Sequence, residues 1–314
     1  LEGLQSDFLK TMRDRGFLHQ CTGITDLDEQ MSNDGVVSAY VGFDATADSL
    51  HVGSLLQIMI LRHLQKSGHR PIVLIGGGTS KVGDPTGKDE SRVLLDDEGV
   101  ARNTAGISKV FKTFLDFEEE GSDENEANAA IMVNNNDWLG NLNYLDFLRE
   151  YGTQFSINRM LSFESVKQRL SREAPFSFLE FNYMILQAYD FYQLFKNKKC
   201  ILQIGGSDQW GNIVSGVDLI RRILKKESCG LTTPLITLAS GSKMGKTEKG
   251  AIWLNEKLFS AYDYWQFWRN TDDRDVLKFL KIFTDLEVSE IDTLKNKNIN
   301  ELKILLANKA TTML

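Results

Sequence analysis

The sequence predicts an α/β fold, in which a doubly wound parallel sheet is followed by a loop and a partial helical domain. Three segments have the composition of short strands, and each leads into a polar or glycine-rich turn. A helical pattern follows the first and the third of these turns. Strands that alternate with helices in this way are typical of a parallel sheet with both faces covered.

The first strand and helix lie near the N-terminus. Residues 35–43 (GVVSAYVGF) are apolar and rich in β-branched side chains, which favours a strand. The polar turn 44–49 separates this strand from residues 50–65, whose apolar side chains recur at helical spacing. We therefore expect a strand, a loop and a helix in that order.

Two later segments repeat the pattern. Residues 70–75 (RPIVLI) form a short, continuous apolar run that ends in three glycines, as in a strand buried on both faces. Residues 200–204 (CILQI) end in two glycines, and helical spacing follows over 210–225. These junctions indicate a parallel sheet with loops at one edge.

The C-terminal part has a different character. Residues 240–250 are polar and rich in glycine and lysine, which is typical of a mobile loop. Aromatic residues then recur at helical spacing over 262–268. We therefore expect a loop followed by a helical region.

Composition and charge exclude several classes of protein. The 314 residues are 42% hydrophobic and 25% charged, an ordinary globular composition. No apolar run approaches the roughly 18 residues of a membrane span, so we expect a soluble protein. The formal net charge of -7 argues against a broad basic face for nucleic acid. Because Leu1 is not a start methionine, the sequence leaves open whether a targeting segment precedes it.

Cysteines and acidic residues give no sign of a metal site. Cys21, Cys200 and Cys229 are odd in number and too far apart for a CxxC pair. We expect reduced thiols and therefore a reducing compartment, the cytoplasm. Six carboxylates in the segment 117–126 are more typical of a solvated loop than of a metal site.

The glycine-rich turns do not fit the common phosphate-binding motifs. Gly83 and Gly87 enclose three residues where a P-loop needs four, and Asp89 follows Lys88 in place of Ser or Thr. The run 76–81 lacks the last glycine of GxGxxG. A generic ATPase or dehydrogenase is therefore disfavoured.

A stronger signal is a pair of motifs, HVGS at residues 51–54 and KMGKT at residues 243–247. Separately, HVGS suits an ordinary helix start and KMGKT suits a solvated loop. Together they favour a nucleotide site, because a helix N-terminus with free N–H groups attracts phosphate and Gly53 allows close approach. His51 can donate to phosphate oxygens, and loop lysines suit a leaving pyrophosphate. Nucleotidyl transfer needs positioning and charge neutralisation rather than a protein nucleophile.

One helix carries a polar stripe within apolar surroundings. Tyr183, Gln187 and Asp190 stand at i, i+4 and i+7, so they share one face. An amphipathic surface helix would explain this pattern, but apolar residues surround the stripe on nearly every side and favour burial. Buried polar groups need partners, and an amino-acid substrate could supply them.

These motifs resemble those of the class I aminoacyl-tRNA synthetases, whose signatures are HIGH and KMSKS. Four stretches are similar to bacterial tyrosyl enzymes, and the similarity extends from about Phe8 into the helical region. The resemblance implies a Rossmann-like catalytic domain that makes tyrosyl-adenylate from tyrosine and ATP and then charges tRNA(Tyr). The four stretches are YVGFDATADSLHVGS (40–54), GDPTGK (83–88), YMILQAYDF (183–191) and LQIGGSDQWGN (202–212).

The resemblance also implies roles for individual residues. Tyr40 and Asp190 would hold the substrate phenol. Three side chains would face its ammonium group and one its carboxylate: Asp84, Tyr183 and Gln187 for the former, Gln209 for the latter. Phosphate and pyrophosphate contacts would come from His51, Thr46, Lys243, Lys246 and Thr247. The remaining ATP-binding positions would be Gly42, Asp44, Gly53, Gly206, Asp208 and Met244.

The family further implies Mg²⁺ carried by the ATP phosphates, no protein-bound metal, and a homodimer. It divides the chain into a catalytic domain over 1–233 with an inserted dimerisation region, a linker over 234–258 with the KMGKT loop, and a truncated anticodon-side helical domain over 259–314. Members of the family continue into an S4-like RNA-binding domain. We therefore expect this chain to form tyrosyl-adenylate but to charge tRNA poorly.

Two departures and two alternatives qualify the resemblance. Ser54 replaces the second histidine of HIGH, and Gly245 replaces the first serine of KMSKS. A tryptophanyl enzyme would share the fold and signatures but would have no phenol to recognise, so Tyr40 and Asp190 favour tyrosine. An RNA-binding splicing cofactor derived from a synthetase is the other alternative, and no basic insertion supports it. His19, His63 and His69 are assigned no function.

Overall fold

The computed structural model describes residues 3–33, 35–86, 95–118, 127–172, 175–241, 244–247 and 250–314. Its centre is a six-stranded sheet in the order β1-β6-β5-β2-β3-β4. The strands are β1 (Gln20–Cys21), β2 (Ser38–Asp44), β3 (Arg70–Gly76), β4 (Ile131–Asn134), β5 (Cys200–Gly206) and β6 (Cys229–Thr233).

The sheet is doubly wound, as predicted. From the central strand β2 the chain moves outward to β3 and β4, then returns to the other side for β5 and β6. All of these neighbours pair in parallel. The short edge strand β1 pairs with β6 in antiparallel orientation and was not predicted. The winding direction changes between β2 and β5, where ligands bind in folds of this kind.

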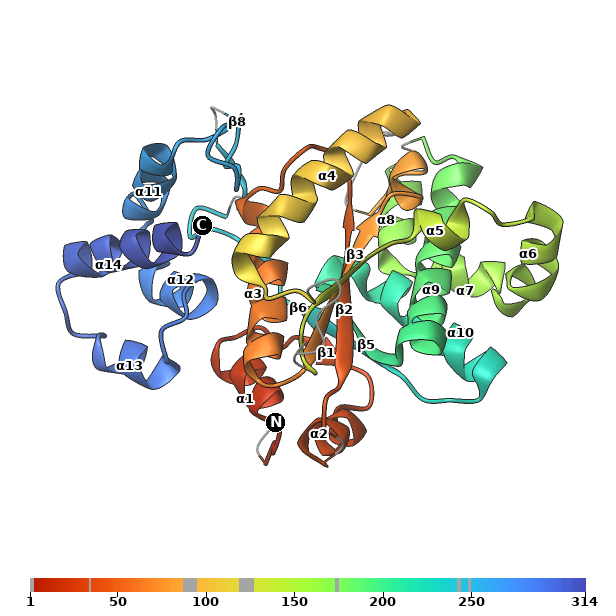
Figure 1. Ribbon diagram of the computed structural model, residues 1–314, viewed down its shortest axis with the longest axis horizontal. Coiled ribbons are helices and arrows are strands. Elements are labelled where there is room, and N and C mark those ends of the chain that lie inside the picture. The colour runs from red at the N-terminus through yellow and green to blue at the C-terminus, as the bar shows by residue number, and fades with distance from the viewer. Residues whose placement is uncertain are drawn as a thin grey trace.

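Helices cover both faces of the sheet (Figure 1). On one side lie α1 (Asp7–Asp14), α3 (Val52–Lys66) and α4 (Asp97–Phe114), and on the other α9 (Phe178–Lys198) and α10 (Trp210–Leu224). Side chains of β2 alternate between the two layers: Val41 and Phe43 join the first core, and Tyr40 joins the second with Phe191. Helix α2 (Ile24–Asn33) lies near the N-terminus.

The elements predicted from the sequence are present. The segment 35–43 contains the start and most of β2, and the predicted helix over 50–65 begins at Val52 because His51 caps it. Strand β5 continues through the two glycines that were expected to end it. Helix α11 (Ala261–Arg269) contains the aromatic pattern 262–268.

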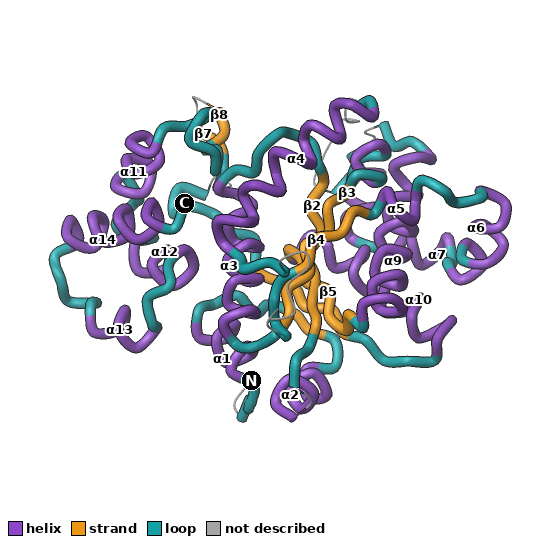
Figure 2. The backbone as a smooth tube through the Cα atoms, viewed as in Figure 1, coloured by secondary structure: helices purple, strands orange, loops and turns teal. Residues whose placement is uncertain are grey.

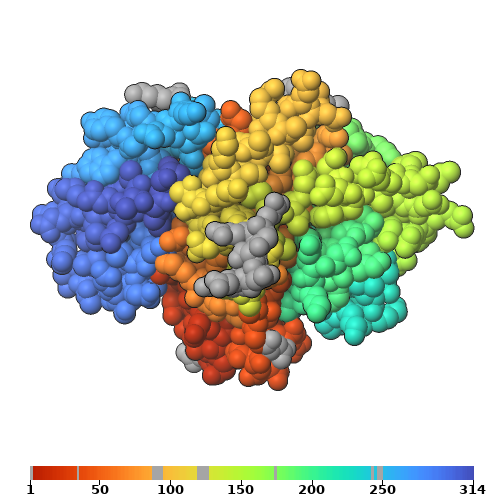
Figure 3. All heavy atoms as spheres, viewed as in Figure 1, coloured from red at the N-terminus to blue at the C-terminus, as the bar shows by residue number. Residues whose placement is uncertain are grey.

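Four short helices form a lobe beside α9 that was not predicted (Figures 1 and 3). They are α5 (Asn136–Leu139), α6 (Tyr144–Glu150), α7 (Ile157–Ser162) and α8 (Glu164–Ser171). These helices were not predicted because they are short, and hydrophobic periodicity identifies a helix only over a longer segment. The acidic segment 117–126 lies outside the described residues from position 119 onward.

At the opposite end, four helices pack beside α3 (Figures 1 and 2). The partly buried Arg62 of α3 donates to Asp285 of this region at 2.7 Å, and one apolar core runs through both parts. The helical region is therefore present, while the domain boundaries at 233/234 and 258/259 stay predictions. Its elements are a hairpin of β7 (Lys246–Thr247) and β8 (Gly250–Ala251), and α11, α12 (Val276–Phe283), α13 (Val288–Thr293) and α14 (Ile299–Thr312).

Within the described residues, no helix is both long and apolar enough to cross a membrane.

Candidate active site

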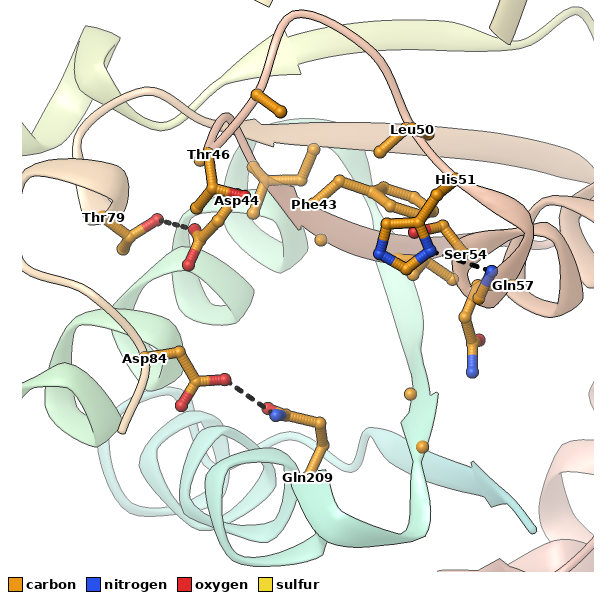
Figure 4. Close-up of a pocket in the computed structure, with 18 of the residues that line it drawn as sticks. Phe43, Asp44, Thr46, Leu50, His51, Ser54, Gln57, Thr79, Asp84 and Gln209 are labelled. Atoms are coloured by element: carbon orange, nitrogen blue, oxygen red, sulfur yellow. Dashed lines mark hydrogen bonds between the residues drawn. The ribbon is translucent and has the colours of Figure 1, made fainter. Parts of the chain in front are cut away.

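A cavity of about 820 Å³ opens at the carboxyl ends of β2 and β5, where the sheet changes its winding direction (Figure 4). Its volume is within the range of small-molecule sites. Twelve of the residues singled out from the sequence line it: Tyr40, Gly42, Asp44, Thr46, His51, Gly53, Asp84, Tyr183, Gln187, Asp190, Gly206 and Gln209. The structure thus brings together segments that are far apart in the sequence.

The most buried part of the cavity surrounds Asp190. Asn135 donates to its Oδ2 at 2.9 Å and the Trp138 indole donates to its Oδ1 at 2.7 Å. Burial raises the pKa of Asp190 to about 7, and these two hydrogen bonds act in the opposite direction. The Tyr40 hydroxyl lies nearby, fully buried and without a partner among the described residues. Burial, reinforced by the negative charge of Asp190, raises the pKa of Tyr40 well above its usual range.

A second hydrogen-bonded group connects α9 to the strand ends. The Tyr183 hydroxyl donates to Asp44 Oδ2 at 2.9 Å. Thr79 donates to the other carboxylate oxygen, Oδ1, at 2.8 Å (Figure 4). Burial raises the pKa of Tyr183 well above its usual range, and the nearby carboxylates of Asp44 and Asp84 add to the shift. Tyr183 is therefore a neutral donor whose proton is directed at Asp44.

Hydrogen-bonded amides support the part of the cavity wall that carries Asp84 and Gln209 (Figure 4). Gln209 donates to Asp84 Oδ2 at 2.8 Å, and Asn212 donates to both Gln209 and Gln187 at 3.0 and 3.1 Å. Asp84 also accepts from the backbone N–H of Thr86 at 2.9 Å, which is the turn role expected of an aspartate beside glycine. These contacts fix the orientation of two amides and one carboxylate that face the cavity.

The start of helix α3 differs from the expectation in one respect. Its first N–H groups were expected to be free, but Val52 donates to the carbonyl of Ile252, Gly53 to Nδ1 of His51 and Ser54 to the carbonyl of His51. The carbonyl of Ile252, which follows KMGKT, therefore accepts from the first of these N–H groups. The imidazole of His51 accepts from the second. Because Nδ1 accepts a hydrogen bond, the neutral imidazole carries its proton on Nε2.

KMGKT and HVGS are adjacent in space. A Cβ atom placed on Gly245 would lie 3.2 Å from both Cα and N of Gly53 and 3.1 Å from Nδ1 of His51. Lys243 lies outside the described residues, and of Lys246 and Thr247 the structure describes only the backbone, in β7. The position of the loop agrees with the prediction, whereas the predicted contacts of these three side chains stay predictions.

A smaller cavity of about 290 Å³ adjoins the first and shares Gly53, Gln57 and Gly206 with it. Asp208 and Met244, both predicted to contact ATP, line it. Its other lining residues are mostly apolar: Val52, Leu56, Leu235, Ile236 and Phe283, with Thr233 and Pro234. A planar, weakly polar group would fit between these side chains.

Several residues that line the cavity or hold its lining side chains in place were not predicted from the sequence. Asn135 and Trp138 follow β4, and only the cluster of asparagines after an apolar run could have pointed to them. Asn212 stands within the motif LQIGGSDQWGN, yet no role was drawn from it. Gln203 is a polar residue inside a strand, which is a signal in itself because buried strand positions are usually apolar.

The winding of the sheet and the cavity at its switch point define a nucleotide-binding α/β domain with an adjoining polar pocket for a second substrate. Comparison with known proteins then gives the family. Residues 32–314 match the family described as tRNA synthetases class I (W and Y). The chain belongs to this family.

Curated relatives agree with this assignment. A tyrosine--tRNA ligase of Pelagibacter ubique is 62% identical over 307 residues, which are 98% of this chain and 73% of that protein. A tyrosine--tRNA ligase of Rhodospirillum rubrum is 59% identical over 312 residues, again covering 98% of this chain and 73% of the relative. The chain thus spans about three quarters of the length of these relatives.

Solved structures show the same fold. A C-terminally truncated mitochondrial tyrosyl-tRNA synthetase of Aspergillus nidulans superposes with a TM-score of 0.85 at 32% identity, covering 99% of this chain and 91% of that one. A tryptophanyl-tRNA synthetase of Encephalitozoon cuniculi gives a TM-score of 0.66 at 12% identity, with 98% of this chain and 89% of that one covered. The second comparison shows only that the fold is shared.

Proposed function

We propose that this chain is a tyrosine--tRNA ligase, which activates tyrosine with ATP and transfers the tyrosyl group to tRNA(Tyr). The observation that supports it best is the buried pair of Tyr40 and Asp190 in a cavity that extends to the HVGS helix. A phenol can accept from the Tyr40 hydroxyl and donate to the Asp190 carboxylate. Phenylalanine would leave the buried Tyr40 hydroxyl without a partner and would offer no donor to the buried Asp190 carboxylate, which is costly.

The amides and carboxylates next to this pair suit the rest of the amino acid. Asp84 and the oxygens of Tyr183 and Gln187 would face the ammonium group, and Gln209 would orient the carboxylate. The hydrogen bonds among Gln209, Asp84 and Asn212 hold this wall in place without substrate, so little ordering is needed on binding.

ATP would lie across both cavities. The apolar cavity near Met244 suits the adenine, with Asp208 at the ribose and Gly42, Asp44, Gly53 and Gly206 lining the nucleotide path. His51, with Thr46, would contact the phosphates and donate from Nε2. The described residues contain no group of three or more potential metal ligands, and we place Mg²⁺ on the ATP phosphates, where it would neutralise charge.

In the first step, a carboxylate oxygen of tyrosine attacks the α-phosphorus of ATP. The new bond is an acyl-phosphate P–O bond, and the bond to the bridging oxygen of the β-phosphate breaks, so pyrophosphate leaves. Lys243, Lys246 and Thr247 would stabilise the departing charge. No protein nucleophile is needed, because positioning and electrostatics provide the catalysis.

We also propose that the protein is a homodimer and that it is located in the cytoplasm. Large apolar side chains are exposed on the lobe formed by α5–α8 and at the first residue of α9. They include Tyr144 (62%), Leu145 (68%) and Ile157 (64%) of the lobe and Phe178 (70%) of α9. Large exposed apolar side chains that gather in one region of a surface are typical of an interface. We place the dimer contact on this lobe, within the region 1–233.

Pyrophosphate exchange tests the proposal. Purified chain is incubated with ATP, labelled pyrophosphate and one amino acid at a time. Tyrosine-dependent exchange is expected, with phenylalanine at least about 100-fold less effective in kcat/KM, since phenylalanine makes neither the hydrogen bond to the Tyr40 hydroxyl nor the one to the Asp190 carboxylate. Exchange that depends on tryptophan would support the tryptophanyl alternative, and intron RNA binding without any exchange would support the splicing cofactor.

A further inference from the structure

The linker that leads into KMGKT is hydrogen-bonded to the helical region through a residue to which no function has been assigned. Oδ2 of Asp275, just before α12, accepts a hydrogen bond from the backbone N–H of Ala239 at 2.7 Å. Asp275 is 5% exposed. A hydrogen bond from an N–H group to a buried carboxylate is stronger than a neutral one and is costly to lose. The linker is therefore fixed to α12 shortly before KMGKT begins.

The carboxylate of Asp275 binds the linker and does not cap its own helix. Asp275 occupies the N-cap position of α12, where an aspartate usually accepts from an N–H group of the first turn. Its backbone is instead helical, with φ of -97° and ψ of -14°, and its side chain makes no capping hydrogen bond. The positive end of the helix dipole still stabilises the negative charge. Asp275 thus presents a charged acceptor to a backbone group 36 positions earlier in the chain.

Helix α12 gives this contact a firm support. Four of its side chains are almost completely buried in the core that the catalytic and helical parts share: Val276, Phe279, Leu280 and Phe283. Phe283 also lines the smaller cavity, as does Met244 of KMGKT. A displacement of the linker relative to α12 would therefore change the position of KMGKT at that cavity.

The chain that follows KMGKT is fixed to a different element. The carbonyl of Ile252 accepts from the N–H of Val52 at 2.8 Å, and the N–H of Leu254 donates to the carbonyl of Leu50 at 2.8 Å. Both partners lie at the start of α3, on either side of His51. KMGKT is thus held between two contacts, one to α12 before it and one to HVGS after it.

We propose that Asp275 is a positioning residue for the attack on ATP: it fixes the entry of KMGKT, so that Lys246 and Thr247 meet the departing pyrophosphate. The inference rests on the proposed function and deepens it, because it adds a residue of the helical region to the groups that act on ATP. Asp275 lines neither of the two cavities and acts only through the linker. Without its hydrogen bond the linker can move away from α12, and the loop side chains then lose their fixed place at the phosphates.

The first variant, Asp275→Ala, removes the acceptor. In pyrophosphate exchange we expect kcat/KM for ATP to fall about tenfold, the value of one hydrogen bond to a charged group. KM for tyrosine should change less than about twofold, because neither Asp275 nor Ala239 lines the large cavity. Titration of active sites by tyrosyl-adenylate formation should give the wild-type number of sites, whereas a folding defect would reduce that number.

The second variant, Ala239→Pro, removes the donor of the same contact. Gly241 donates to the carbonyl of Leu238 at 2.8 Å, which closes a turn with Ala239 at its second position. Proline is favoured at this position and has no N–H group. The variant should therefore show the same fall as Asp275→Ala, and the double variant should be no worse than either. Losses that add in the double variant would overturn the proposal, because two changes that remove one interaction are not additive.

Two further variants are matched controls. Asp275→Asn keeps an oxygen that can accept from Ala239, so kcat/KM for ATP should fall less than about threefold. Asp273→Ala removes a carboxylate from the same turn, but Asp273 pairs with Lys303 of α14 at 2.5 Å and not with the linker. This variant should leave kcat/KM for ATP unchanged. A fall equal to that of Asp275→Ala would mean that any loss of charge in this turn has the same effect, and would overturn the assignment to Asp275.

The remaining outcomes separate the inference from the proposed function. If tyrosine supports no exchange in the wild-type chain, the proposed function fails and the inference fails with it. If wild-type exchange is normal and both Asp275→Ala and Ala239→Pro leave kcat/KM for ATP unchanged, only the inference fails. Should Asp275→Ala not fold, Ala239→Pro still decides, because it leaves every residue of the helical region in place.

Discussion

The indole N–H of Trp138 donates to Oδ1 of Asp190 at 2.7 Å, across 52 positions of the sequence. Asn135, three residues before the indole, donates to the other carboxylate oxygen at 2.9 Å. Both donors belong to the segment that follows β4, so the geometry of one cavity-lining carboxylate depends on a segment that is distant in the sequence. The two hydrogen bonds also favour the ionised form of a group that burial drives towards the protonated form.

Trp138→Phe should raise the pKa of Asp190 above its value of about 7 in the wild-type protein. Fewer molecules would then carry the carboxylate at neutral pH, and tyrosine would lose an acceptor. We expect kcat/KM for tyrosine-dependent exchange at pH 7 to fall about tenfold or more, the value of a hydrogen bond to a charged group. The acidic limb of the pH profile should move to higher pH, a shift that a purely structural defect would not produce.

Asp190 should also make folding stability depend on pH. Its pKa in the folded protein is about 7, above the ordinary 3.8, so the folded state binds the proton more tightly than the unfolded state does. The contribution to stability is therefore present below pH 4 and is lost as the pH rises through 7. Urea unfolding between pH 4.5 and 8 should show a steeper loss for the wild type than for Asp190→Asn, and parallel curves would contradict the prediction.

A part of the fold or the site could be predicted when the residues that form it lie close together in the sequence. The strands β2, β3 and β5 and the helix α3 follow from local composition and periodicity. Their meeting at one edge of the sheet follows from the rules of parallel sheets. The motifs that follow these strands line one cavity at the carboxyl ends of β2 and β5.

Contacts made by isolated side chains could not be predicted. Nothing in the sequence places Asn135 against Asp190, because that contact depends on how the short helix α5 packs. The capped start of α3 was missed for a similar reason, since Ile252 reaches it from a strand pair 200 positions away. The sequence also does not show that His63, which was assigned no function, is buried beside Arg62 and Lys66.

His63 should destabilise the protein in acid. Burial lowers its pKa to about 3, and the neighbouring Arg15 adds to the shift. The unfolded state, with an ordinary value of 6.5, therefore binds a proton that the folded state excludes. Stability is present above pH 6.5 and is lost as the pH falls towards 3, by up to about 1.4 kcal/mol per pH unit.

The measurement is denaturant unfolding at a series of pH values, with His63→Leu as the comparison. Leucine fills a similar volume and has no proton to bind, so this variant should lose less stability between pH 6.5 and 4.5 than the wild type does.

Gly245→Ala should weaken the binding of ATP. Gly245 has φ of +118°, and an added Cβ would lie 3.1–3.2 Å from His51 and Gly53. The substitution adds backbone strain and a contact that pushes KMGKT away from the start of α3. We expect the KM for ATP in pyrophosphate exchange to rise by about tenfold or more, while the KM for tyrosine changes little, since the phenol end of the cavity is distant in the fold.

Gly250→Ala separates the two effects. This glycine begins β8 and has φ of +111°, but an added Cβ would meet no atom of the described residues within 4 Å. The variant therefore carries the backbone strain without the crowding against HVGS. If both alanine variants raised the KM for ATP equally, the effect would come from strain in the hairpin, and the contact between Gly245 and Gly53 would have no role in nucleotide binding.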